Sequence, residues 1–148
     1  MKTTLSTEQQ LAQARVSLMN SVEFRWMAGI LMTGDTKFVS GKDAKIQTAA
    51  TDGLNETYNR EWMANLDVEE VKFVVLHEGF HKMFRHLFVW RNLWDDNPQL
   101  ANIACDVVIN TQYLHGKPGI KFVKGGVHME EYADAMKWNA KSIFDNLK

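Results

Sequence analysis

The chain has 148 residues, of which 45% are hydrophobic and 24% charged, a composition typical of one globular domain and not of a disordered or fibrous protein. Seventeen basic and eighteen acidic residues give a net charge of −1, without the basic excess of a nucleic-acid-binding domain. The single cysteine excludes an internal disulfide framework. The sequence shows no secretory signal and no apolar run of membrane-spanning length, so we expect a cytoplasmic protein with no membrane or nucleic-acid partner.

The chain is predicted to form a single domain, 1–148. Its N-terminal segment, residues 1–34, is expected to be helical. Ser6 and Gln9 have the spacing of a capping box, which places the start of a helix near residue 7. Apolar residues then recur at roughly helical spacing as far as Leu31, and the pattern stops at Gly34.

Residues 35–60 favour a β-hairpin. Asp52-Gly53 is a strong turn signal between short runs of strand-forming residues. The strand candidates are residues 37–39, 46–51 and 56–59.

Residues 67–148 are predicted to form a helical core that binds zinc. Asp67 is an N-cap candidate, and apolar residues from 68 to 90 occupy most of a helix circumference, which predicts a central helix covered on several sides. Pro98 suits the first turn of a second buried helix that runs to about Leu114. A loop is expected over residues 116–128, with short helical segments at 129–136 and 142–147.

The strongest motif is His77-Glu78-Gly79-Phe80-His81, which has the form H-E-x-x-H inside the central predicted helix. Two histidines four residues apart project from one helix face and can bind the same metal ion. Imidazole suits zinc, and Glu78 can take a proton from a metal-bound water and donate it to a leaving amine. The pattern therefore predicts a catalytic Zn²⁺ site. The simpler alternative is a pair of core histidines with Glu78 as their hydrogen-bond partner.

A catalytic zinc site needs a third protein ligand, and Asp106 is the preferred candidate. It is a lone carboxylate in an apolar run, where it requires a cation or strong hydrogen-bond donors. Asn102, Asp106 and Asn110 are spaced by four, so they form a polar stripe that an antiparallel helix pair can present to the two histidines. Asn102 and Asn110 would then orient the ligands. The alternative is an ion pair between Asp106 and an arginine such as Arg85 or Arg91.

His86 is an alternative ligand. If the central helix continues, His86 lies roughly 180° from His77, so it can bind the same ion only if the helix breaks before it. No glycine or proline lies between His81 and His86, and we therefore expect a continuous helix with His86 at the surface. Weaker candidates are loop ligands, a core thiol and oxyanion-stabilising tyrosines: His115, His128, Cys105, Tyr58, Tyr113 and Tyr132.

The ordered set of motifs resembles the predicted metallopeptidase domain that precedes a von Willebrand factor A-type domain in many bacterial and phage proteins. The resemblance implies an α+β, mostly α fold with a zincin-like core, in which a β-hairpin precedes the motif helix and a second helix packs against that helix. It also implies zinc held by His77, His81 and Asp106, with Glu78 as catalytic base. If the hairpin carries the edge strand of such a core, it could bind an extended peptide by strand addition. The matching pieces span residues ~45–148 and are Thr51-Asp52-Gly53, Tyr58-Asn59, His77-Glu78-x-x-His81 with His86, Asn102-Ile103-Ala104-x-Asp106 with Asn110, and Ser142-Ile143-Phe144-x-x-Leu147.

Three functional hypotheses are open at this point. The preferred one is a zinc-dependent endopeptidase acting on a protein or peptide substrate, which requires an open metal coordination position. The first alternative is a non-catalytic, zinc-stabilised interaction domain with four protein ligands, for example with His86 or His115 closing the site. The second is a metal-free helical partner protein whose folding is insensitive to chelators. Glu78 favours the peptidase, because a purely structural zinc site has no need of that carboxylate.

Overall fold

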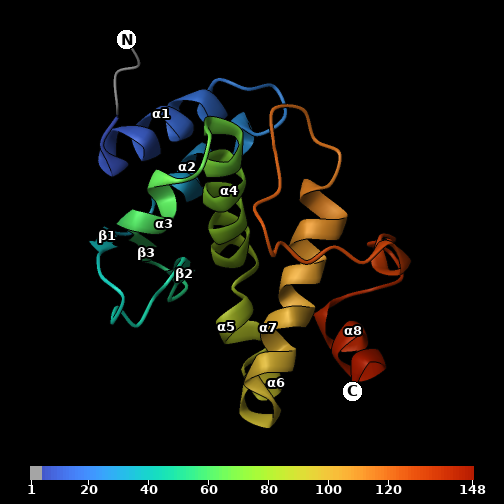
Figure 1. Ribbon diagram of the computed structural model, residues 1–148. Coiled ribbons are helices and arrows are strands. Elements are labelled where there is room, and N and C mark those ends of the chain that lie inside the picture. Colours follow the sequence, from blue (N-terminus) through green and yellow to red (C-terminus); the bar gives the residue numbers. More distant parts are fainter. Residues whose placement is uncertain (1–4) are drawn as a thin grey trace.

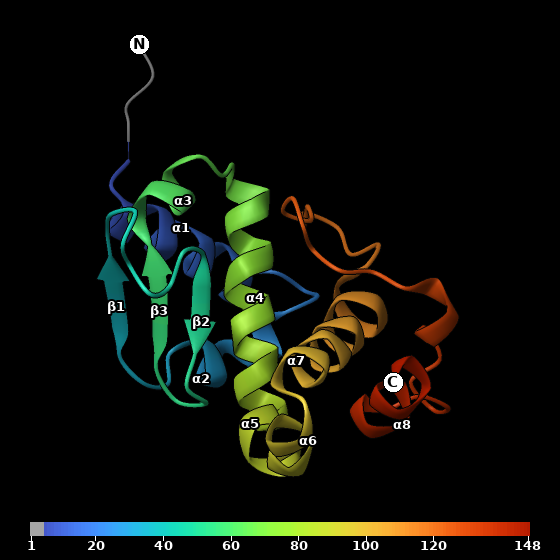
Figure 2. The same ribbon diagram turned by 60° about the horizontal axis from the view of Figure 1, so that its bottom comes forward.

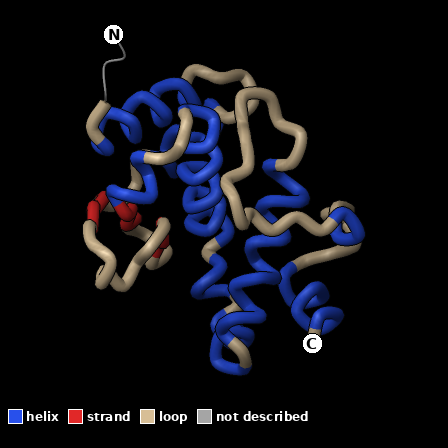
Figure 3. Tube along the Cα trace, viewed as in Figure 1, coloured by secondary structure: helices blue, strands red, loops and turns tan. Residues whose placement is uncertain are grey.

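The computed structural model describes residues 5–148, so residues 1–4 of the predicted N-terminal segment lie outside the described part of the chain. The described residues are mostly helical, with one small sheet, which confirms the predicted α+β, mostly α class (Figure 3). The single domain and the zincin-like core stay predictions. Within residues 5–148, no helix has both the length and the apolar character needed to cross a membrane.

The sheet has three strands in the order β1-β3-β2. Their bounds are β1 (Thr36–Val39), β2 (Ala49–Thr51) and β3 (Glu56–Asn59). β2 and β3 form the predicted antiparallel hairpin, whose turn is held by the Asp52 carboxylate as it accepts hydrogen bonds from the main-chain N–H groups of Leu54 and Asn55. β1 pairs with β3 in parallel, and the predicted strand residues 46–48 lie outside the sheet.

The predicted N-terminal helix is divided into three elements, α1 (Thr7–Met19), η1 (Arg25–Met27) and α2 (Ala28–Leu31). The predicted capping box of Ser6 and Gln9 is confirmed. The helix is interrupted at Ser21, whose hydroxyl donates to the Leu18 carbonyl and accepts from the Phe24 N–H. Such local bonds compete with the helical hydrogen-bond pattern. One continuous helix through this segment is therefore wrong.

The central helix α4 (Val68–Phe84) carries the H-E-x-x-H motif. It begins as predicted, with Asp67 as N-cap in a capping box with Glu70. The predicted continuation to residue 90 is wrong, because Arg85 adopts the left-handed conformation (φ 53°, ψ 42°) and ends the helix. The chain resumes in two short helices, α5 (His86–Val89) and α6 (Arg91–Asp96).

The second predicted helix begins at α7 (Pro98–Val107), with Pro98 in its first turn and Asn97 as its N-cap. It continues as a π-helical segment, η2 (Val108–Leu114). A loop then leads to η3 (Glu130–Tyr132) and to α8 (Ala140–Leu147). α8 confirms the predicted final helix, whereas the helix expected over residues 129–136 is only the single turn η3.

Two apolar cores hold these elements together. One core joins α1, α2 and the sheet to α4, and the other joins α6 and α7 to α8. Cys105 lies in the second core, as expected for a small apolar side chain. Figure 2 shows α4 between the sheet on one side and α7 on the other. In Figure 1, α7 runs in the opposite direction to α4, as the sequence predicts for the pair of buried helices.

Candidate metal centre

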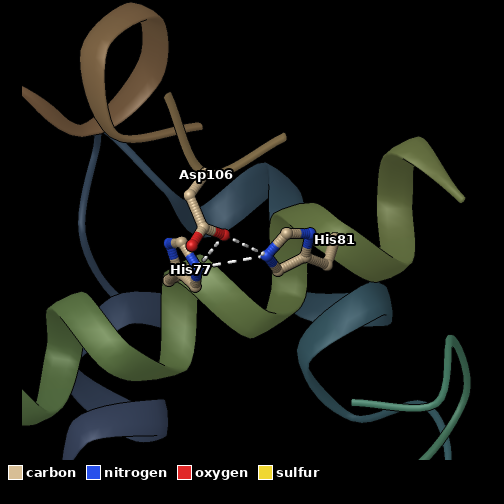
Figure 4. A group of neighbouring side chains, drawn as sticks. All are labelled: His77, His81 and Asp106. Carbon is tan, nitrogen blue, oxygen red and sulfur yellow. Dashed lines mark hydrogen bonds and ion pairs between the residues drawn. The ribbon is translucent and has the colours of Figure 1, made fainter. Parts of the chain in front are cut away.

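The three predicted metal ligands come together between α4 and α7 (Figure 4). His77 and His81 are four residues apart on α4, so both rings project from one helix face. Asp106 comes from α7, and its Oδ1 lies 3.1 Å from His77 Nε2 and 3.0 Å from His81 Nε2. The two Nε2 atoms are themselves 3.1 Å apart. All three donor atoms therefore face one point.

The donor set suits a divalent metal ion. One ligand atom from each of the three residues lies within 4.8 Å of the others. Two imidazole nitrogens and a carboxylate oxygen are ordinary zinc ligands, and three protein ligands leave a position open for water or substrate. The structure thus brings the predicted ligands together, and their role as ligands stays a prediction.

Burial and hydrogen bonding act in opposite directions on the pKa values of His77 and Asp106. Burial alone would lower the pKa of His77, but the hydrogen bond to Asp106 and the negative charges of Glu78 and Asp106 together outweigh burial and raise this pKa to about 9. Burial would likewise raise the pKa of Asp106, yet hydrogen bonds from His77 and His81 keep it well below its usual range. Asp106 is therefore ionised, the form in which a carboxylate binds a metal ion.

Two asparagines contact predicted ligands, as expected from the polar stripe. His77 Nδ1 donates a hydrogen bond to Oδ1 of Asn110 on η2 over 2.7 Å, and Nε2 is then the nitrogen available to a metal ion. Asn102 Nδ2 donates to Oδ2 of Asp106 over 3.3 Å. Because Asn110 is buried and Asn102 exposed, the contact with His77 is the more rigid of the two.

His86 occupies a different position from the expected one. Its residue is only 3% exposed, and its Nδ1 lies 3.1 Å from Nδ1 of His81. The left-handed turn at Arg85 causes this change, because it ends α4 and brings α5 back toward the motif. Burial, followed by the charge of His81, lowers the pKa of His86 to about 3, so the His86 ring is neutral. His86 thus contacts the nitrogen of His81 that faces away from Asp106.

Glu78 lines a cavity of about 300 Å³ together with the three predicted ligands. Its residue is 6% exposed, and burial raises the pKa of its carboxyl, although the neighbouring His77 and His81 oppose this shift. A carboxyl with a raised pKa is typical of a group that exchanges protons in catalysis. The position of Glu78 is therefore compatible with the predicted role of a base.

The other walls of the cavity come from the predicted hairpin region and from a loop that the motifs do not identify. Residues 48–51, which include β2, line one side, and residues 123–127 from the loop after η2 line another. Phe73 stacks on the ring of His77, with ring centroids 5.8 Å apart. The sequence predicts residues 123–127 only as part of a loop, and the glycine pair 125–126 is the one local feature that marks a close backbone approach.

Sequence reasoning also missed a buried charge network beside the site. Glu56 on β3 is 2% exposed and accepts hydrogen bonds from Arg15 at 2.8 Å and from the Tyr58 hydroxyl at 2.7 Å. Its other oxygen pairs with Lys82 Nζ at 2.6 Å. Burial, together with Glu56, raises the pKa of Tyr58 far above its usual value, so this tyrosine is a neutral donor to Glu56. Lys82 follows His81 on α4, and the network therefore fixes the motif helix against the sheet.

The remaining candidates are engaged elsewhere. Arg85 and Arg91, the alternative partners of the α7 carboxylate, place their guanidinium groups over the ring of Phe88. His115 and His128 stack on each other and do not join the three predicted ligands.

The chain matches a known family over all of its described elements. A family model described as "Putative metallopeptidase domain" matches residues 5–148. This match is longer than the stretch of residues ~45–148 over which the motifs alone show a resemblance. No curated protein and no solved structure matches the chain at a significant level.

Proposed function

The chain belongs to this metallopeptidase-domain family, and from that premise we propose that it is a zinc-dependent endopeptidase. One observation carries the proposal: His77, His81 and Asp106 face one point in a cavity that Glu78 also lines. This is the combination that hydrolysis requires, because a metal site and a proton-transfer group must act on the same substrate atom.

We assign zinc as the metal ion because two imidazoles and one carboxylate are common zinc ligands with an open fourth position. When bound there, a zinc ion supplies a Lewis acid for the substrate carbonyl and activates water as the nucleophile. His86 and Asn110 support the assignment, since each contacts the Nδ1 atom of a ligand histidine and so aims its Nε2 atom at the shared point.

Glu78 acts as the proton carrier in this proposal. It accepts a proton from the water molecule whose oxygen forms a bond to the peptide carbonyl carbon. When the C–N bond breaks, Glu78 donates that proton to the leaving amine nitrogen and returns to its starting state. Burial favours this exchange, because it brings the pKa of the carboxyl up from its ordinary value toward neutral pH.

An extended peptide is the substrate that the cavity wall suits. β2 is an outer strand of the sheet, and its residues line the cavity. An outer strand offers main-chain groups with which an extended peptide can pair. The α1 residue Arg15 bonds to Thr36 of β1 and to Glu56 of β3, and neither of these hydrogen bonds involves β2.

The substitution Glu78→Gln tests the proposal, because it removes the proton carrier and keeps the side-chain shape. We expect the variant to retain the dialysis-resistant zinc ion of the wild type and to lose about 10²–10⁴-fold in peptide hydrolysis. Zinc is counted by elemental mass spectrometry, and hydrolysis is followed with a library of quenched fluorescent peptides. Asp106→Ala should lose both the ion and the activity.

Glu69→Gln is the matched control, since it makes the same change at an exposed position of the same helix. It should keep both zinc and activity. Unchanged hydrolysis in Glu78→Gln would contradict the peptidase assignment. A wild-type protein that holds zinc and cleaves nothing would instead support the non-catalytic interaction domain.

A further inference from the structure

We propose that His115, His128 and Glu130 form a second metal-binding site, which anchors the loop that walls the cavity. The three residues share no ligand with the site between α4 and α7. The proposal concerns metal binding alone, so its test does not depend on peptidase activity.

The three side chains are already grouped in the structure. The rings of His115 and His128 stack with centroids 4.0 Å apart and planes 18° from parallel. His128 Nε2 lies 3.2 Å from a carboxylate oxygen of Glu130. One ligand atom from each residue lies within 4.8 Å of the others, and within residues 5–148 only the group between α4 and α7 also meets this condition.

The donor set favours a borderline divalent cation such as Zn²⁺. Imidazole nitrogen binds Zn²⁺, Ni²⁺ and Cu²⁺ well, whereas Mg²⁺ and Ca²⁺ prefer oxygen ligands throughout. The His128 side chain is 28% exposed and that of Glu130 75% exposed, so an ion can reach them from solvent and the side chains can turn toward it. Such an open site would hold its ion less tightly than the more enclosed group between α4 and α7, because water competes for the coordination positions.

The loop between these ligands forms one wall of the cavity, since residues 123–127 line it. Gly116, Gly119 and Gly125 in this loop have φ angles of 76°, 75° and 89°, which glycine adopts without strain. Glycine also gives an unanchored loop more conformational freedom than other residues do. An ion bound to the two histidines at the ends of the loop would tie these ends together and reduce that freedom.

A series of aromatic contacts connects the second site to the first. The ring of Phe122, inside the loop, lies 6.3 Å from that of His115 and 6.2 Å from that of His128. Phe122 packs on Phe73 at 4.5 Å, and Phe73 stacks on His77 at 5.8 Å. Anchoring the loop would therefore hold Phe122 in place and steady the ring of a predicted ligand of the first site.

Titration of the full chain with Zn²⁺, counted by native mass spectrometry, tests the proposal. We expect the wild type to bind two ions and both His128→Ala and Glu130→Gln to bind one. Glu131→Gln is the matched control, because it makes the same charge change at the adjacent exposed residue and should still bind two. As the count rises from one ion to two, amide hydrogen exchange over residues 116–128 should slow in the wild type and in the control.

If the wild type binds one ion at saturating Zn²⁺ and Asp106→Ala loses that ion, the protein has no second site. A second ion that His128→Ala retains would lie elsewhere, and loop exchange that ignores the second ion would remove the anchoring role. Asp106→Ala distinguishes the two sites, since it should lose the dialysis-resistant ion and keep the one that depends on His128.

Discussion

Asn110 contacts Nδ1 of His77, and its truncation tests whether this contact orients the ring for metal binding. In Asn110→Ala the Nδ1 atom of His77 loses its acceptor at 2.7 Å, and the ring is free to turn its Nε2 atom away from Asp106. Loss of such an orienting contact costs about 10–100-fold in metal affinity. Competition with a chromogenic chelator measures this change on the folded variant.

Asn102→Ala is the comparison for that experiment. Its bond to Asp106 is longer, at 3.3 Å, and the residue is exposed, so we expect a clearly smaller loss of zinc affinity. Equal losses in the two variants would show that Asn110 has no special role in orienting His77.

The sequence predicts the positions of side chains along a continuous helix but not beyond the residue at which the helix ends. The spacing of four brings Asp106 and Asn110 to the motif histidines, and Asn102 to Asp106, as expected. His86 is misplaced because the expectation assumes a continuous helix. One left-handed residue changes the direction of the chain, and arginine at that position carries no signal for such a turn.

Arg85 defines the end of α4, and two substitutions at this position measure how the left-handed turn affects the free energy of unfolding. Both Arg85→Gly and Arg85→Ala remove the guanidinium group that lies over Phe88. Glycine adopts the left-handed conformation freely, whereas alanine pays about 1–2 kcal/mol there. We therefore expect Arg85→Gly to be the more stable variant by about 1 kcal/mol in urea unfolding. In a continuous helix the order would be reversed, since alanine is favoured over glycine by about 1 kcal/mol.

The predicted helix caps and hairpin turn agree with the structure, whereas the parallel pairing of β1 with β3 is a feature that the sequence does not predict. The caps at Ser6 and Asp67 and the Asp52 turn each depend on residues within a few positions of one another. The parallel pairing of β1 with β3 joins segments 20 residues apart, and no local pattern encodes it. No local pattern predicts the π-helical segment η2 either. Four residues of an α-helix turn about 40° beyond a full circle, and the wider turn of η2 offsets this excess.

The stability of the fold depends on Glu56, because this carboxylate joins α1, β3 and α4 in one buried network. Glu56→Gln keeps the shape of the side chain and leaves Lys82, which is nearly inaccessible, without a negative partner. Breaking a buried ion pair in this way costs about 3–5 kcal/mol of the free energy of unfolding. Urea denaturation followed by circular dichroism measures the loss.

The double variant Glu56→Gln/Lys82→Met is the control for that prediction. It removes the uncompensated ammonium group, so part of the lost free energy should return. If the single variant is as stable as the wild type, the network does not hold α4 on the sheet. The sequence could not predict this network, because its charged members lie on three elements that only the folded chain brings together.

The three predicted metal ligands lie between the two apolar cores, with two of them on α4 of the first core and one on α7 of the second. A metal ion bound to all three residues would link the two cores, which otherwise contact each other through side-chain packing. Its binding would then raise the free energy of unfolding, because separating the two cores would release the ion. The cell's supply of metal would therefore set how firmly this protein resists being pulled apart or degraded, independently of any bond that it cleaves.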